Sequence, residues 1–163
     1  MVMKKIAIQG IQGSYHHKVA VNYFGENIEI FECLSFDDVA SSVISGKCEL
    51  GVMAIENSIA GSIIPNYSII DNSNLEIIGE YYFDINHQLL AYPGVEIKDL
   101  EFISSHPMAL LQCKDFLKKN PKITLIEARD TAKVAHEIKK NKIKNTGAIA
   151  SIEAAELYSL NII

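Results

Sequence analysis

Short apolar, β-branched runs alternate along this chain with amphipathic stretches, and this alternation constrains the fold more than any other feature. The runs KKIAIQG, IEIFEC and CELGVMAI are separated by the helix-like stretches HHKVAVNYFG and SFDDVASSVISGK. A strand, a helix and a second strand of the same sheet form a parallel crossover unit. The pattern therefore predicts an α/β fold with parallel strands and crossover helices.

The second half of the chain repeats this alternation, which indicates two lobes. A long β-rich segment, LEIIGEYYFDINHQLLAYPG, begins near residue 75. We interpret it as one or two strands that lead from a first αβ lobe, residues 1–80, into residues 81–163, which hold crossing strands and a second αβ lobe. Helices are predicted there over 107–118, 130–140 and 151–158. Two such lobes are typical of proteins that bind a small ligand in a cleft.

Composition and charge exclude several classes of partner. The 163 residues are 48% hydrophobic, which is enough for a buried core, and 15 basic against 20 acidic side chains give a net charge of -5. No basic stripe is interleaved with aromatic residues, so a nucleic-acid partner is not expected. No apolar run approaches the roughly 18 residues of a membrane span, and the first residues lack the apolar core of a signal peptide. We therefore expect a cytoplasmic protein without a membrane partner.

The three cysteines are predicted to be structural thiols. Cys33, Cys48 and Cys113 are odd in number, widely spaced and outside any CxxC pattern. Neither a disulfide framework nor a zinc site is indicated. Free cysteines among apolar neighbours are usually buried, so no metal site is expected and the thiols are expected to pack in the core.

Four segments place a helix start directly after a strand. They are GIQGSYH at 10–16, IENSIAGS at 55–62, SSHPMAL at 104–110 and ARDTAKVA at 128–135. In an open αβ sheet the carboxyl ends of the strands border the ligand crevice. A helix start also presents backbone N–H groups and the positive end of a dipole, which favour anions. These segments therefore predict a site that favours an anionic ligand.

Two of these helix starts combine an ordinary cap with a candidate functional side chain. In SSHPMAL, Ser105 or His106 is placed to cap a helix that begins at Pro107, and His106 is either such a cap or a hydrogen-bond donor to a ligand. In ARDTAKVA, Asp130 is an N-cap, whereas Thr131 adds a hydroxyl and an N–H at the same helix start. We rank Thr131 above His106 as a ligand contact.

The segment IENSIAGS raises a different question, because polar residues end an apolar run. A helix is predicted from about Ser58, its cap, to Ile70, which leaves Glu56 and Asn57 at the end of a strand. Their polarity costs free energy there unless they are partnered. They either clamp the two lobes or line the cleft. GIQGSYH, by contrast, can be a glycine-relaxed turn alone, and it lacks the glycine patterns of nucleotide-binding loops, so nucleotide binding is not expected.

Taken in order, these segments resemble the catalytic domain of the prephenate dehydratase family. GIQGSYH is similar to the family's GPEGTFS, and AIENSIAGSI to its PxENSxxGxV, with Ala54 in place of the proline. SHPMALLQC is similar to SHPQALAQC, DTAKVA to STAGAA with Lys133 in place of a glycine, and AAELYSLNII to AAxxYGLxIL. INHQLL contains the family's histidine before paired leucines, as His87. The resemblance covers essentially the whole chain.

The resemblance implies a function, a fold and a set of site residues. The fold would be a two-lobed α/β architecture similar to type II periplasmic binding proteins. The activity would be decarboxylating dehydration of prephenate to phenylpyruvate in phenylalanine biosynthesis, without a metal or organic cofactor. The expected catalytic residues are Glu56, Asn57 and Thr131. The expected substrate-binding residues are Ser14, Tyr15, Asn57, Ser58, Ser105, His106 and Thr131.

Glu56 and Asn57 are expected to position the substrate and to give the cleft polar support. A second hypothesis makes Glu56 the general acid, which requires the carboxyl group to stay protonated near neutral pH. The family pattern continues past this sequence with a Thr-Arg-Phe motif, whose threonine is central to catalysis in the family, and with a regulatory domain. Neither is present in the sequence, so we expect it to be part of a longer catalytic domain, and the activity of these 163 residues alone stays open.

Two other functions remain open from the sequence. A non-catalytic domain that binds or senses a small carboxylate would share the two-lobed fold. A related dehydratase acting on another chorismate-derived acid would share the fold, but not the combination of ENSxxG with SHPxALxQC. An exposed sheet edge could also promote a homodimer.

Overall fold

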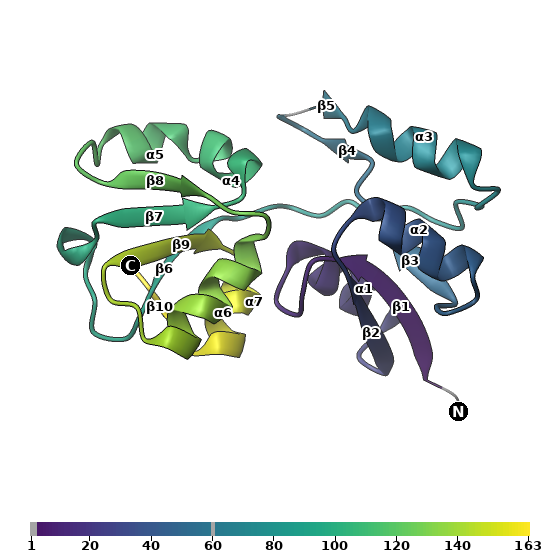
Figure 1. Ribbon diagram of the computed structural model, residues 1–163, viewed down its shortest axis with the longest axis horizontal. Coiled ribbons are helices and arrows are strands. Elements are labelled where there is room, and N and C mark those ends of the chain that lie inside the picture. Colours follow the sequence, from purple (N-terminus) through teal and green to yellow (C-terminus); the bar gives the residue numbers. More distant parts are fainter. Residues whose placement is uncertain (1–2, 60) are drawn as a thin grey trace. The chain divides into compact units, whose positions relative to one another are not determined.

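A computed structural model describes residues 3–59 and 61–163 of the chain. The chain forms two compact units, Met1–Asp84 and Ile85–Ile163, and each contains its own sheet and helices (Figure 1). The predicted α/β class is confirmed in both units. No helix in the described part of the chain is both long and apolar enough to cross a membrane.

The first unit is built on a three-stranded parallel sheet. Its strands are β1 (Lys4–Gln9), β2 (Ile28–Cys33) and β3 (Leu50–Val52), in the order β2-β1-β3. The connecting helices are α1 (Tyr15–Phe24) and α2 (Phe36–Ile44). Both neighbours of β1 run parallel to it, which confirms the predicted crossover units.

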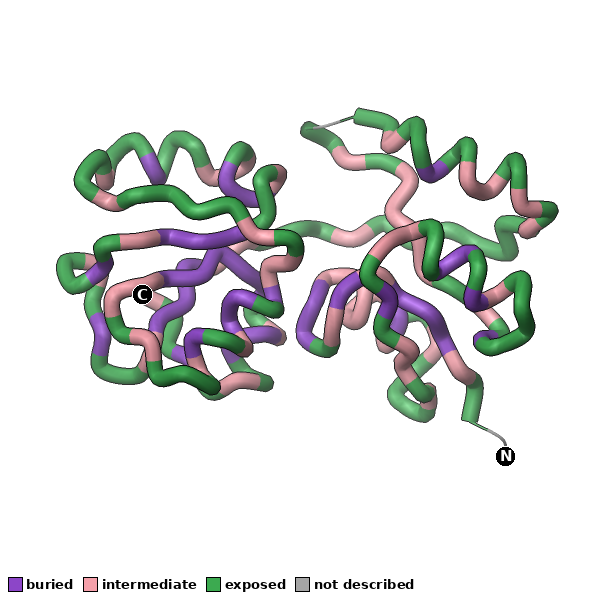
Figure 2. Tube along the Cα trace, viewed as in Figure 1, coloured by how far each residue is buried: buried purple, intermediate pink, exposed green. Residues whose placement is uncertain are grey.

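The alternation of side chains along β1 places α1 and α2 on opposite faces of this sheet. Ile6 and Ile8 pack with Ala20 of α1, whereas Ala7 packs with Val39 of α2. Successive residues of a strand point to opposite faces, so these two clusters lie on the two sides of β1. The buried stretch along β1 is visible in Figure 2.

Local caps define the ends of the helices in the first unit. Ser35 and Asp38 form a reciprocal capping box at the start of α2. Gly25 ends α1 at a φ of 85°, a conformation that glycine adopts without a steric penalty. These residues set where α2 begins and where α1 ends.

The helix predicted over 58–70 is wrong in its first part. The chain forms a short antiparallel hairpin, β4 (Glu56–Asn57) and β5 (Gly61–Ser62), before α3 (Ile64–Asn72) begins. Gly61 has a φ of 77°, which takes the backbone out of the right-handed helical region. Pro65 then lies in the first turn of α3, where its missing N–H costs nothing. Ser58 lies in the hairpin turn and does not cap a helix.

The segment between α3 and β6 is extended, but the prediction of strands before residue 88 is wrong for the described residues. Alternate residues of this segment contact α1. Tyr81 packs edge-on against Tyr23 at 6.3 Å between ring centroids, and a β-carbon on Gly79 would collide with the Tyr23 hydroxyl. Alternate residues thus face α1, as they would in a strand, but the described residues of this segment do not pair with a neighbouring strand.

The second unit contains a five-stranded mixed sheet in the order β10-β6-β9-β7-β8. Its strands are β6 (Gln88–Ala91), β7 (Phe102–Ser105), β8 (Thr124–Glu127), β9 (Thr146–Ala150) and β10 (Asn161–Ile162). The strands β8, β7 and β9 are parallel, as predicted. β6 runs antiparallel to β9. β10, close to the end of the chain, runs antiparallel to β6.

The helices of the second unit follow the predicted order with one break. They are α4 (Pro107–Gln112), α5 (Lys114–Lys118), α6 (Thr131–Asn141) and α7 (Ile152–Tyr158), with a short 3-10 helix, η1 (Ile97–Asp99). The single helix expected over 107–118 is divided at Cys113, which has a φ of -95° and a ψ of 11°. Leu89, Ile103 and Ile149 form the core with residues of α4 and α5, and the buried sheet strands are visible in Figure 2.

Candidate active site

One group of predicted site residues follows β1. Gly10 and Gly13 have positive φ values of 98° and 88°, which turn the chain sharply between β1 and α1. Ser14 is the N-cap of α1, and its hydroxyl oxygen accepts a hydrogen bond from the His17 N–H at 3.2 Å. Tyr15, the first residue of α1, packs its ring against Phe83 at 6.1 Å. The turn thus fixes both side chains at the carboxyl end of the sheet.

The hairpin β4–β5 carries the other predicted residues of the first unit. The strand β3 ends at Val52, so Glu56 and Asn57 do not close a buried strand, as the sequence had suggested. The Glu56 side chain is exposed, and its carboxylate accepts a hydrogen bond from the Ser62 hydroxyl at 3.0 Å. The Asn57 side-chain oxygen accepts one from the Ile59 N–H at 3.0 Å. Ser58 is exposed in the turn. This hairpin therefore offers polar groups to a ligand.

A second group lies at the carboxyl ends of β7 and β8. These neighbouring strands are parallel, with Ser105 opposite Glu127, so the turns that lead to α4 and α6 leave the same edge of the sheet. His106 is exposed and caps α4, because its Nδ1 accepts a hydrogen bond from the Met108 N–H at 3.2 Å. A neutral ring with an accepting Nδ1 carries its proton on Nε2. That N–H is a donor directed away from the cap.

Ser105 and Thr131 differ in what the structure offers a ligand. Ser105 is 0% exposed, and its hydroxyl donates a hydrogen bond to the Ile149 backbone oxygen at 2.6 Å, which ties β7 to β9. Thr131 is the half-buried first residue of α6. Asp130 caps this helix as predicted, since its carboxylate accepts a hydrogen bond from the Lys133 N–H at 2.7 Å. The hydroxyl of Thr131 thus lies at the positive end of an eleven-residue helix.

The structure also joins two motif residues for which no role was predicted. His87 Nε2 and Gln112 Oε1 lie 2.6 Å apart and link the start of β6 to the end of α4. Both residues occur in segments that resemble family motifs, INHQLL and SHPMALLQC. Their pairing could not be found from the sequence, since 25 positions separate them.

His16 is a further residue whose surroundings the sequence did not reveal. It lies half-buried in the first turn of α1. Its ring meets Phe36 edge-on at 5.4 Å between centroids. Desolvation by burial lowers the pKa of His16 from 6.5 to about 4, against the opposing effect of a hydrogen bond to the Gln9 backbone. His16 therefore remains neutral at physiological pH.

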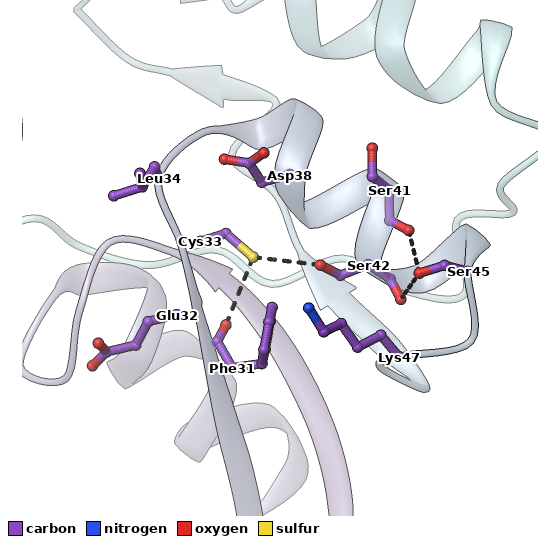
Figure 3. A pocket seen from close by; sticks show the side chains of 9 residues that line it. All are labelled: Phe31, Glu32, Cys33, Leu34, Asp38, Ser41, Ser42, Ser45 and Lys47. Atoms are coloured by element: carbon purple, nitrogen blue, oxygen red, sulfur yellow. Dashed lines mark hydrogen bonds between the residues drawn. The ribbon is translucent and has the colours of Figure 1, made fainter.

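A pocket of about 370 Å³ lies between the end of β2 and α2, away from the predicted residues (Figure 3). The Lys47 ammonium group lies over the Phe31 ring at 4.7 Å from its centroid. The carboxylates of Glu32 and Asp38 also line the pocket, and they would repel a ligand that carries two carboxylates. The candidate site residues are therefore the motif residues described in each unit, and not those that line this pocket.

Comparison with known proteins identifies the family. The model of the family described as "Prephenate dehydratase" matches residues 6–163. The chain belongs to the prephenate dehydratase family. All of the predicted site residues lie inside the matched region.

Relatives in this family have related names but longer chains. The chain is 38% identical over 159 residues to "Arogenate dehydratase/prephenate dehydratase 1, chloroplastic" from Arabidopsis thaliana, a match that covers 98% of this chain and 40% of that protein. The chain thus spans about 40% of the length of this curated relative.

Solved structures support the same fold. A prephenate dehydratase from Arthrobacter aurescens in complex with L-Phe is 25% identical with a TM-score of 0.86, over 97% of this chain and 54% of that one. A protein described as GqqA, a novel type of quorum quenching acylase, is 30% identical with a TM-score of 0.84, over 98% of this chain and 57% of that one.

Proposed function

We propose that the protein containing this chain converts prephenate into phenylpyruvate in phenylalanine biosynthesis. The observation that carries the proposal is the ENSxxG segment, which the fold presents as an exposed hairpin with a carboxylate and an amide, in a chain of the matching family. Prephenate loses one carboxylate as carbon dioxide while the ring hydroxyl leaves with a proton as water. The ring becomes aromatic, which drives the reaction.

The proposed roles follow from this chemistry. The substrate carries two carboxylates, and the α6 start with Thr131 and the α1 start with Ser14 and Tyr15 would bind negative charge. His106 would donate from Nε2 to a substrate oxygen, in line with its accepting Nδ1. Backbone and hydroxyl donors of this kind hold an anion without a metal ion.

The ENS hairpin would orient the reacting ring. We assign Glu56, Asn57 and Ser58 to positioning of the substrate, with a proton-donating role for Glu56 as the second hypothesis. Ser105 has a supporting role in this proposal, because its buried hydroxyl already donates to Ile149 and holds β7 in place. This differs from the direct substrate contact expected from the family resemblance.

Dehydration of arogenate, the amino-acid counterpart of prephenate, is the second candidate. The name of the Arabidopsis relative contains both activities, which favours this candidate over a purely binding function. A substrate with an ammonium group in place of the keto group would also place a cation near the site. The hairpin carboxylate of Glu56 is exposed and could face it.

The deciding experiment supplies the full-length protein with prephenate or arogenate at neutral pH and quantifies phenylpyruvate and phenylalanine, against a blank for spontaneous decay. We expect turnover of at least one substrate. A Glu56→Gln variant should lose roughly tenfold or more in kcat/KM, an effect typical of a lost charged hydrogen bond. Glu49→Gln, an exposed change just before β3, is the matched control and should retain activity.

Two results would change the proposal. Full activity of Glu56→Gln would exclude the proton-donating role of Glu56. If neither substrate is turned over but calorimetry shows that prephenate binds, the function would be carboxylate binding or sensing and not catalysis.

The proposal includes a cytoplasmic location and a homodimer. Cys33, Cys48 and Cys113 are all free thiols, as is usual in a reducing compartment. The edge strand β8 exposes all four of its residues, including Leu125 and Ile126, and such edges favour association. Light scattering that gives a monomer mass at every protein concentration would contradict the homodimer.

A further inference from the structure

Asn66 is an unusual residue for a helix to bury. Among the described residues of α3 it is the buried one, with 3% exposure. Its apolar neighbours Ile64 and Tyr67 are 64% and 42% exposed. A surface helix normally buries its apolar residues, and a buried amide costs free energy unless it is hydrogen-bonded. The position of Asn66 therefore requires an explanation other than the hydrophobic effect.

The side chain of Asn66 contacts the segment between β3 and the ENS hairpin. Its Nδ2 donates a hydrogen bond to the Ala54 backbone oxygen at 2.7 Å. Its backbone N–H donates to the Ile63 oxygen at 2.9 Å. One residue thus bonds to both arms of the hairpin, two positions before Glu56 on one arm and one position after Ser62 on the other.

The register of the hairpin explains why a side chain is needed at this point. Glu56 pairs with Ser62, and the Ile63 N–H donates to the Ile55 oxygen at 2.8 Å. Hydrogen-bonded and non-hydrogen-bonded pairs alternate in an antiparallel hairpin, so the next hydrogen-bonded pair would be Met53 with Pro65, which has no N–H to donate. The ladder ends here. The Ala54 oxygen lies in a non-hydrogen-bonded position and points away from the second arm, so the Asn66 amide supplies a donor that the ladder cannot.

We propose that Asn66 is a positioning residue that locks the base of the β4–β5 hairpin and thereby sets the placement of Glu56 and Asn57. This inference rests on the proposed function, in which those two residues orient the substrate. A hairpin of two strands is marginally stable by itself, and this one has only short strands. Without the Asn66 bond, its base would open more often and the two side chains would spread over several positions.

The first test measures the lock itself, without any substrate. Asn66→Leu keeps a side chain of similar size and removes the donor. Asn72→Leu is the matched control, since Asn72 Nδ2 also donates to a backbone oxygen, that of Ser68 at 2.8 Å, within the same helix but away from the hairpin. In the full-length protein, Asn66→Leu should speed amide exchange at Ile63 about tenfold, whereas Asn72→Leu should not.

Amide exchange in β1 shows whether the Asn66 hydrogen bond holds only the hairpin or contributes to the stability of the whole first unit. The Ile8 amide should exchange at the same rate in wild type and Asn66→Leu. Equal acceleration at Ile8 and Ile63 would overturn the proposal, and so would unchanged exchange at Ile63. If Asn66→Leu does not fold, Asn66→Ser, which keeps a shorter donor, replaces it and should give a smaller acceleration confined to the hairpin.

The second test measures the consequence for the reaction. In the variant with a loosened hairpin, we expect kcat/KM for prephenate or arogenate to fall roughly tenfold, with most of the loss in kcat, because the substrate still binds but is poorly oriented. Asn72→Leu should retain wild-type kinetics. A loosened hairpin with unchanged kcat and KM would overturn the positioning role. Failure of the wild-type protein to turn over either substrate would instead reject the proposed function, while the exchange result would still decide the lock.

Discussion

At the scale of single residues, the burial of His16 couples the stability of the first unit to pH. The ring is half-buried against Phe36, and its pKa falls from 6.5 to about 4. Between these two values the unfolded chain binds a proton that the folded chain does not bind. Stability therefore rises with pH in this window and is lost as the pH falls from 6.5 towards 4.

We predict that replacement of His16 removes this dependence. The free energy of unfolding of the wild-type first unit should fall with a slope of up to about 1.4 kcal/mol per pH unit on acidification through the window. His16→Leu should flatten that slope. His136→Leu, a half-buried histidine of the second unit that packs against Tyr158, is the control and should leave it unchanged. Urea unfolding at several pH values measures the slopes, and parallel slopes for His16→Leu and wild type would contradict the prediction.

Local chemistry explains which residues could be predicted from the sequence. Asp130 was assigned as a cap because a short polar side chain before an apolar helix acts through neighbouring backbone groups. The partner of Ser105, by contrast, is Ile149, which lies 44 positions away. Substrate binding by Ser105 was expected from the family resemblance alone, and no local pattern in the sequence indicates that its hydroxyl donates to a backbone oxygen of β9.

At the scale of elements, the His87–Gln112 hydrogen bond joins β6 to α4. The bond is 2.6 Å long and partly buried, so removal of either partner loses the contribution of this bond to stability. We predict that His87→Leu and Gln112→Leu each lower the free energy of unfolding of the second unit by about 1–2 kcal/mol. Because the bond can be lost only once, the double variant should lower the free energy of unfolding by less than the sum of the two single variants.

A double-mutant cycle from urea unfolding tests this coupling. Asn120→Leu is the control, because Asn120 donates to the Phe116 oxygen at an exposed position of the same unit. It should change stability little. Strict additivity of the His87 and Gln112 variants would show that the two side chains contribute independently.

The ENS segment shows where prediction of elements failed. The apolar spacing after Ser58 fits a helix, and Ser58 is a good cap. Two residues prevent a helix from beginning at Ser58, since Gly61 takes a positive φ and Pro65 suits only a first helical turn. The parallel strands were predicted correctly because β-branched runs and helical periods alternate, whereas a two-residue strand has no period to detect.

At the scale of the whole molecule, three buried apolar clusters of described residues each lie within a single unit. In the described chain, Ile8 packs in a cluster of the first unit and Ile103 in a cluster of the second. Each unit has a sheet and helices of its own. A loss of packing in one cluster should therefore weaken the unit that contains it.

We predict that mild core substitutions in the full-length protein act on one unit at a time. Ile8→Val and Ile103→Val each remove one buried methylene, which costs about 1 kcal/mol. Amide exchange should accelerate about fivefold, in keeping with that loss, in Met1–Asp84 for Ile8→Val and in Ile85–Ile163 for Ile103→Val. The two variants are controls for each other, because the chemical change is the same. Equal acceleration in both units by either variant would mean that the chain unfolds as a single cooperative body. The His16 slope would then belong to the whole chain and not to its first unit.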